Sequence, residues 1–99
     1  MAYQKKDNKD EENYVMVIQA EYGQSQFTAY RADIGAIRCI VKRSAKTNYK
    51  RSFKRIKIND LVMVKYYSAF NRGHILYKIT EQQKIISYMK KYKFPLVDV

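Results

Sequence analysis

The sequence predicts a mainly β protein, a small five-stranded barrel followed by one C-terminal helix. Five runs rich in β-forming residues are separated by turn signals, a long connection divides the third run from the fourth, and a stretch with helical spacing follows the fifth. A chain of 99 residues is long enough for one domain with one modest hydrophobic core. Closing five short strands into a barrel would remove the exposed edges that an open sheet leaves, so we expect a closed sheet.

The expected strands are bounded by short segments rich in glycine, asparagine, aspartate and serine. The first run ends at residues 23–25, the second at residues 33–35, and residues 59–60 precede the fourth. Residues 68–73 join the fourth run to the fifth as a hairpin turn. The expected strands therefore cover residues 14–22, 26–32, 36–41, 61–67 and 74–79, and residues 55–58 lead into the fourth.

A helix is expected over residues 81–92, because apolar residues there recur at positions i, i+3, i+4 and i+7. Thr80 and Gln83 fit a capping box, with Thr80 as the N-cap. Pro95 ends the pattern. One face of the helix carries Ile85, Tyr88, Met89 and Tyr92. The expected organisation is a disordered mixed-charge tail over residues 1–12, one domain over residues 13–93, and a short C-terminal tail over residues 94–99.

Several classes of protein are disfavoured by composition. One cysteine excludes a disulfide framework and a cysteine-based zinc site, and one histidine leaves no histidine cluster for a metal. The longest apolar run has five residues, far below the ~20 that span a bilayer, and the N-terminal residues have no apolar stretch typical of a secretory signal. We therefore expect a cytoplasmic monomer without a cofactor or metal.

An enzymatic site is not expected either. Asp33, Asp60 and Glu81 each lie at a turn or at the end of an element, with no motif around them. The sequence has no glycine-rich phosphate loop and no recognisable pair of nucleophile and base. Cys39 is expected to be a small buried apolar side chain, and His74 an exposed residue at the start of a strand.

The positive charge is concentrated in one part of the chain. The formal net charge is +11, and no acidic residue occurs between Asp33 and Asp60, where nine lysines and arginines lie. Uncompensated like charges repel one another unless a polyanion neutralises them. This concentration predicts nucleic acid as the partner. An anionic membrane surface is the weaker alternative, because the run lacks the apolar helical stripe that would anchor it.

Five short strands with a long connection between the third and fourth favour the oligonucleotide/oligosaccharide-binding (OB) barrel. An SH3-like barrel is the main alternative, since it also has five short strands. The basic connection over residues 42–57 shows no clean period, which predicts a long loop, and long loops are usually functional or disordered.

The stretch from about residue 14 to residue 92 resembles the translation initiation factor 1A family of eukaryotes and archaea, the counterpart of bacterial initiation factor 1, through five matches in the same order. Gly23 stands at the first glycine of the family's Gly-Asn-Gly-Arg turn, and Asp33 and Cys39 match its third-strand pattern. Residues 42–57 correspond to the family's basic loop, residues 59–64 to its Asp-Ile-Val-Leu-Val strand, and residues 75–81 to the segment that leads into its helix.

The sequence also departs from the family pattern. In the first turn, Ser25 replaces the family's second glycine and Gln26 replaces its arginine. Further along the chain, Arg43 replaces a glycine and Lys57 replaces a tryptophan. The family's basic N-terminal and long acidic C-terminal tails have no counterpart in the sequence. The resemblance implies an S1-like OB barrel that binds small-subunit ribosomal RNA near the A site. It also implies support of pre-initiation complex assembly and start-codon selection, with other initiation factors as possible partners.

Candidate RNA-binding residues come from the basic run and from the strands. Arg31 and Arg38 lie on strands, where burying an unpaired arginine is costly, so we expect both to point outward. Tyr66 and Tyr67 are neighbours on one strand and must face opposite ways; Tyr66 is the candidate for stacking on a base. The remaining candidates lie in or beside the basic run: Lys42, Arg43, Lys46, Tyr49, Lys50, Arg51, Phe53, Lys54, Arg55 and Lys57.

Two other functions remain open. One is a general single-stranded nucleic-acid binder or RNA chaperone of the cold-shock type, without a role on the ribosome. The other is a docking module in which Ile85, Met89 and Tyr92 meet a partner protein; packing of this helix face onto the barrel is the simpler expectation.

Overall fold

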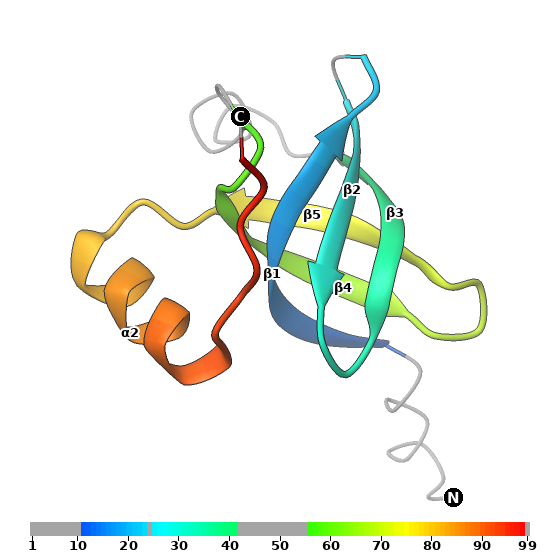
Figure 1. Cartoon of the computed structure of the whole chain (residues 1–99). Helices are drawn as coiled ribbons and strands as arrows, with labels where there is room; N and C mark the ends of the chain where they lie inside the picture. The colour runs from blue at the N-terminus through cyan, green and yellow to red at the C-terminus, as the bar shows by residue number, and fades with distance from the viewer. Residues whose placement is uncertain (1–10, 24, 42–55, 99) are drawn as a thin grey trace, which may run out of the picture.

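The computed structural model describes residues 11–23, 25–41 and 56–98 (Figure 1). Within them the chain forms five strands and a helix, α2 (Gln82–Tyr92). The strands are β1 (Glu11–Glu21), β2 (Gln26–Arg31), β3 (Gly35–Val41), β4 (Leu61–Tyr67) and β5 (Arg72–Lys78). Residues 1–10 of the tail predicted over residues 1–12, and residues 42–55 of the predicted basic loop, lie outside the described residues. Residues 11–12, predicted to be disordered, belong to β1 instead. β1 begins at Glu11, three residues earlier than expected, because residues 11–13 pair with the end of β4.

The strands form a closed barrel in the order β1-β2-β3-β5-β4. β1 pairs with both β2 and β4 in antiparallel fashion, which closes the sheet, and β3 pairs with β5 in parallel. This order is that of an OB-like barrel, and it differs from the consecutive antiparallel pairing expected of an SH3-like barrel. The predicted fold class is therefore confirmed.

Alternate residues of β3 help to fill the interior of the barrel. On β3, Ile37, Cys39 and Val41 are buried while Arg38 and Ile40 are exposed. This pattern arises because successive side chains of a strand point to opposite faces of the sheet. The fully buried Met16 and Ile18 of β1 join this interior cluster. The burial of Cys39 confirms the sequence expectation for its side chain, and desolvation raises the pKa of its thiol to about 12.

Gly73 lies within β5, although the sequence predicted it as the last residue of the hairpin turn. It is buried and is the register partner of Cys39. A Cβ atom built on Gly73 would lie 2.6 Å from Val64 Cγ1 and 2.9 Å from Cys39 Sγ. The interior at this level therefore has no room for a side chain.

The helix packs its predicted apolar face on the outside of the barrel (Figure 1). Ile85, Tyr88, Met89 and Tyr92 contact a second cluster formed by Val15, Val17, Leu61, Ile79 and Phe94. β1 is thus buried on both faces. The predicted packing of α2 onto the barrel is confirmed.

The predicted capping box is wrong. The N-cap of α2 is Glu81, not Thr80, and its side chain makes no capping hydrogen bond. Packing of the apolar face fixes where the helix starts, since most helical stability in proteins comes from tertiary contacts. The helix ends at Lys93, whose left-handed backbone lets its N–H donate to the Met89 carbonyl.

The residues after α2 form an extended segment held against the barrel. Phe94 is buried, and Asn59 bonds both backbone groups of Val97: its Nδ2 donates to the carbonyl over 2.8 Å, and its Oδ1 accepts from the N–H over 2.7 Å. Asn59 has a φ of 80° in the turn before β4. The predicted short tail is therefore docked over residues 94–97.

Candidate nucleic-acid interface

One part of the outer barrel surface is covered and another is open. α2 covers the outer side of β1, the start of β4 and the end of β2, where Val15, Leu61 and Tyr30 lie beneath or beside it. In the described part of the chain, no other element packs over the rest of the outer surface, which β2, β3, β5 and the end of β4 form (Figure 1). We call it the open face. The side chains that it presents are Gln26, Thr28, Arg38, Ile40, Lys65, Tyr67, Arg72 and His74, flanked by Tyr22 and Phe70.

Arg38 contacts two neighbouring side chains on the open face. Its Nη1 donates to Gln26 Oε1 over 3.1 Å, and its guanidinium carbon lies 4.2 Å from the centre of the Tyr22 ring. Gln26 lies on the neighbouring strand β2, and Tyr22 follows β1. The predicted outward direction of Arg38 is confirmed, since it is exposed.

The topology brings Arg72 to Arg38. The two residues are Cα partners across the parallel pair β3–β5, although 33 residues separate them in sequence. Both are exposed, and in the described parts of the chain neither forms an ion pair with a carboxylate. Together with Gln26, Ile40, Gly73 and His74 they line a depression of about 410 Å³. Two cations that no carboxylate of the described residues neutralises make this depression suited to an anion.

Aromatic side chains continue the open face beyond Arg72. Tyr67 and His74 lie edge to face with ring centres 4.9 Å apart, and His74 Nδ1 is 3.2 Å from the Tyr67 hydroxyl oxygen. The Lys65 ammonium lies 5.8 Å from the centre of the Tyr67 ring. Phe70, in the turn between β4 and β5, is 75% exposed. This combination of flat rings and cations is what stacking and phosphate contacts require.

Tyr66, the predicted stacking residue, lies on the opposite side of β4. Its ring packs against the barrel core and meets Tyr14 edge to face at 6.0 Å, and its hydroxyl donates to Asn71 Oδ1 over 3.4 Å. The opposite orientation of the two neighbours was predicted, but Tyr67 is the one on the open face. Local sequence cannot decide which of the two faces out, because the pairing register of β4 sets it.

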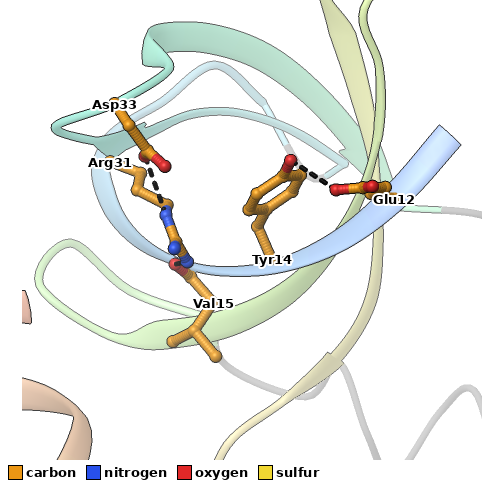
Figure 2. Close-up of polar contacts among 5 residues, drawn as sticks. All are labelled: Glu12, Tyr14, Val15, Arg31 and Asp33. Carbon is orange, nitrogen blue, oxygen red and sulfur yellow. Dashed lines mark hydrogen bonds and ion pairs between the residues drawn. The ribbon is translucent and has the colours of Figure 1, made fainter. Parts of the chain in front are cut away.

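The expectation that Arg31 points outward to the same face as Arg38 is wrong. Its side chain is only 15% exposed and lies at the end of the barrel, where Nε donates to Asp33 Oδ1 over 2.8 Å and Nη1 to the Val15 carbonyl over 3.3 Å (Figure 2). Its guanidinium carbon also lies 4.8 Å from the Tyr14 ring centre and 4.4 Å from that of Tyr92. Partners on every side remove the desolvation cost that would have expelled an unpaired arginine.

Beside Arg31, the Tyr14 hydroxyl donates to Glu12 Oε1 over 2.6 Å (Figure 2). This hydrogen bond, which favours the protonated phenol, raises the pKa of Tyr14 above its ordinary value, and burial adds to the effect. Arg31, Tyr14 and Asp33 thus form a structural contact at the closed end of the barrel, and we leave Arg31 out of the candidate interface.

Nine of the predicted RNA-binding residues lie outside the described residues: Lys42, Arg43, Lys46, Tyr49, Lys50, Arg51, Phe53, Lys54 and Arg55. Lys57 is described and exposed. The residues that flank the segment, Val41 and Ile56, are both buried in the interior cluster. RNA contact by these ten residues stays a prediction.

Sequence reasoning did not select several rings and cations on or beside the open face, among them Tyr22, Lys65, Tyr67, Phe70 and Arg72. Arg72 and Phe70 belong to the segment that the sequence predicted as a turn, and turn residues have no alternation from which to assign a face. For Tyr22, the signal was its position next to the Gly23 turn, since the loops that join β1 to β2 and β4 to β5 border the binding face of OB barrels.

Neither a scan against models of protein families nor a search of curated protein sequences found a match to this chain. The resemblance to factor 1A therefore stays a prediction. Among the described residues there is no helix long and apolar enough to cross a membrane. Residues 11–23, 25–41 and 56–98 also contain no group of three histidine, cysteine or acidic side chains placed to hold a metal ion.

Proposed function

We propose that this protein is an RNA-binding translation initiation factor, similar to factor 1A, that binds the small ribosomal subunit near the A site. There it would support pre-initiation complex assembly and start-codon selection. The observation that carries the RNA-binding part is the open face, where Arg38 and Arg72 lie side by side next to exposed rings. The ribosomal part rests on the ordered sequence matches to the factor 1A family.

Electrostatics support a polyanionic partner. The basic run of residues 38–57 begins with Arg38 on β3, one of the strands of the open face, and Arg72 lies beside Arg38. Phosphate contacts by such cations supply affinity and position, and rings that stack on bases add contacts to unpaired nucleotides. α2 leaves this face uncovered because it packs on the other side of the barrel.

Co-sedimentation with isolated small ribosomal subunits tests the proposal. We expect stoichiometric binding that an authentic factor 1A competes away. If about five phosphates are neutralised, log K should fall with log salt concentration with a slope of about −3.5. The variant Arg38→Glu should weaken binding. Lys90→Glu, at an exposed position of α2, makes the same change of charge away from the open face and serves as the matched control.

Two results would contradict the proposal. Affinity that does not respond to salt would remove its electrostatic basis. Tight binding to any single-stranded RNA without binding to small subunits would instead favour the general single-strand binder of the cold-shock type.

A further inference from the structure

Arg38 and Arg72 form a pair of neighbouring cations on a rigid sheet. As register partners on adjacent strands, their backbones lie about 4.8 Å apart. Cys39 and Gly73, the next residues of each strand, are buried in the interior, so both arginine side chains leave from the outer surface. Guanidinium groups carry planar sets of N–H donors that match phosphate oxygens. An anion bridging the pair would relieve their mutual repulsion.

One member of the pair is already held in place. The Arg38 guanidinium is fixed by its hydrogen bond to Gln26 and by the Tyr22 ring beneath it. Fewer rotamers are therefore lost when Arg38 binds a ligand, which lowers the entropic cost of binding. Among residues 11–23, 25–41 and 56–98, no hydrogen bond or ring contact supports Arg72 in this way, and we expect its side chain to become ordered only when the ligand is bound.

A second depression adjoins the arginine pair. It has a volume of about 420 Å³ and is lined by Tyr67, Phe70, Arg72 and His74, so Arg72 borders both depressions. The Tyr67 and His74 rings hold each other edge to face, which fixes one wall. Phe70 forms the other wall, and its largely exposed ring is available to a planar ligand.

We propose that these two depressions bind one unpaired nucleotide, with its phosphate between Arg38 and Arg72 and its base stacked on Phe70. This inference rests on the proposed RNA-binding function and adds that the bound segment is single-stranded at this point. A base inside a duplex is covered on both faces by its neighbours and cannot stack on a side chain. Purines offer more ring surface than pyrimidines, so adenine is bound more tightly than uracil.

Fluorescence anisotropy with three labelled nine-nucleotide probes tests this inference. The probes are oligo(A), an abasic ribose-phosphate oligomer of the same length, and an RNA duplex that contains the oligo(A) strand. Phe70→Ala should weaken binding of oligo(A) by about 5- to 100-fold and leave the abasic oligomer unaffected. Arg72→Gln should weaken binding of both and reduce the salt slope by about 0.7. The duplex should bind the wild-type protein more weakly than oligo(A).

Matched variants separate stacking from folding and from general charge. Phe70→Leu keeps an apolar side chain without a π face and should behave like Phe70→Ala. Tyr77 is a second exposed aromatic residue; it lies on β5 and outside both depressions. Tyr77→Ala should therefore leave the affinity for oligo(A) unchanged. Lys90→Gln removes a cation from α2 and should change affinity less than Arg72→Gln.

The inference is overturned if Phe70→Ala and Phe70→Leu bind oligo(A) as tightly as the wild type, or if the duplex is preferred. If either result is found and the protein still binds small subunits, the proposed function is retained and only the nucleotide site is rejected. Conversely, Phe70-dependent binding of oligo(A) without any binding to small subunits would support the nucleotide site and reject the initiation-factor function.

Discussion

The guanidinium carbon of Arg31 lies 4.4 Å from the centre of the Tyr92 ring, which joins the end of β2 to the last turn of α2. Arg31 also donates to Asp33 and to the Val15 carbonyl, so one side chain connects the β2–β3 turn, β1 and the helix. Arg31 therefore adds a polar link between the barrel end and α2 beside the apolar packing of the helix.

Replacing Arg31 should loosen the helix. Arg31→Ala is expected to lower the free energy of unfolding by about 2–4 kcal/mol, because it removes two charged hydrogen bonds and two cation–π contacts. Arg31→Lys should lie between this variant and the wild type, since an ammonium cannot reproduce the planar fork. Urea unfolding measures both, and amide exchange should accelerate in α2. Exposed Arg72→Ala is the control; an equal loss there would contradict this role.

Gly73→Ala should destabilise the barrel by about 1–3 kcal/mol, the usual cost of overpacking a filled interior. The added methyl would lie 2.6 Å from Val64 Cγ1. In the Val64→Ala background that atom is absent, so the same substitution should cost less. A double-mutant cycle by urea unfolding measures this coupling. Equal costs in both backgrounds would show that the clash with Val64 does not limit this site.

Asn59 should control the docking of the C-terminal segment. Asn59→Gly keeps the positive φ but removes both hydrogen bonds to Val97, and should cost about 1–3 kcal/mol. Asn59→Ala should cost about 1 kcal/mol more, because alanine is strained in the left-handed region. Hydrogen exchange at the Val97 amide should accelerate in both variants. A Val97 amide that stays protected in Asn59→Gly would contradict this account.

Burial of Cys39 predicts a loss of stability at alkaline pH. Its pKa is about 12 in the folded protein, against an ordinary value of 9.0, because desolvation disfavours the thiolate. Between these values the unfolded chain releases the proton while the folded protein keeps it. The contribution is therefore complete below pH 9.0 and declines as the pH rises toward about 12.

Comparing Cys39→Ala with the wild type isolates this effect. The wild type should lose stability more steeply than the variant over that alkaline range, as measured by urea unfolding at several pH values. At pH 8 the thiol should react with a disulfide reagent only as fast as the protein opens. Rapid reaction of the native protein would show that the thiol is accessible.

Local patterns in the sequence were sufficient to predict the five strands and the buried face of the helix. The cost of burying an unpaired arginine predicted that Arg38 faces out, and the spacing of Ile85 and Met89 predicted the face of α2 that meets the barrel. These features could be predicted because period and burial are properties of consecutive residues. Phe70, which lies in a turn, and Arg72, which begins β5, offered no such pattern.

Only the tertiary structure decided which candidate side chains come together. The register of β4 places Tyr67 rather than Tyr66 on the open face, and contacts from β1 and α2 draw Arg31 into the barrel end. The parallel pairing of β3 with β5 sets Arg72 beside Arg38. Each outcome depends on contacts between segments that are distant in the chain. The free energy of such contacts depends on both segments, so neither segment alone predicts it.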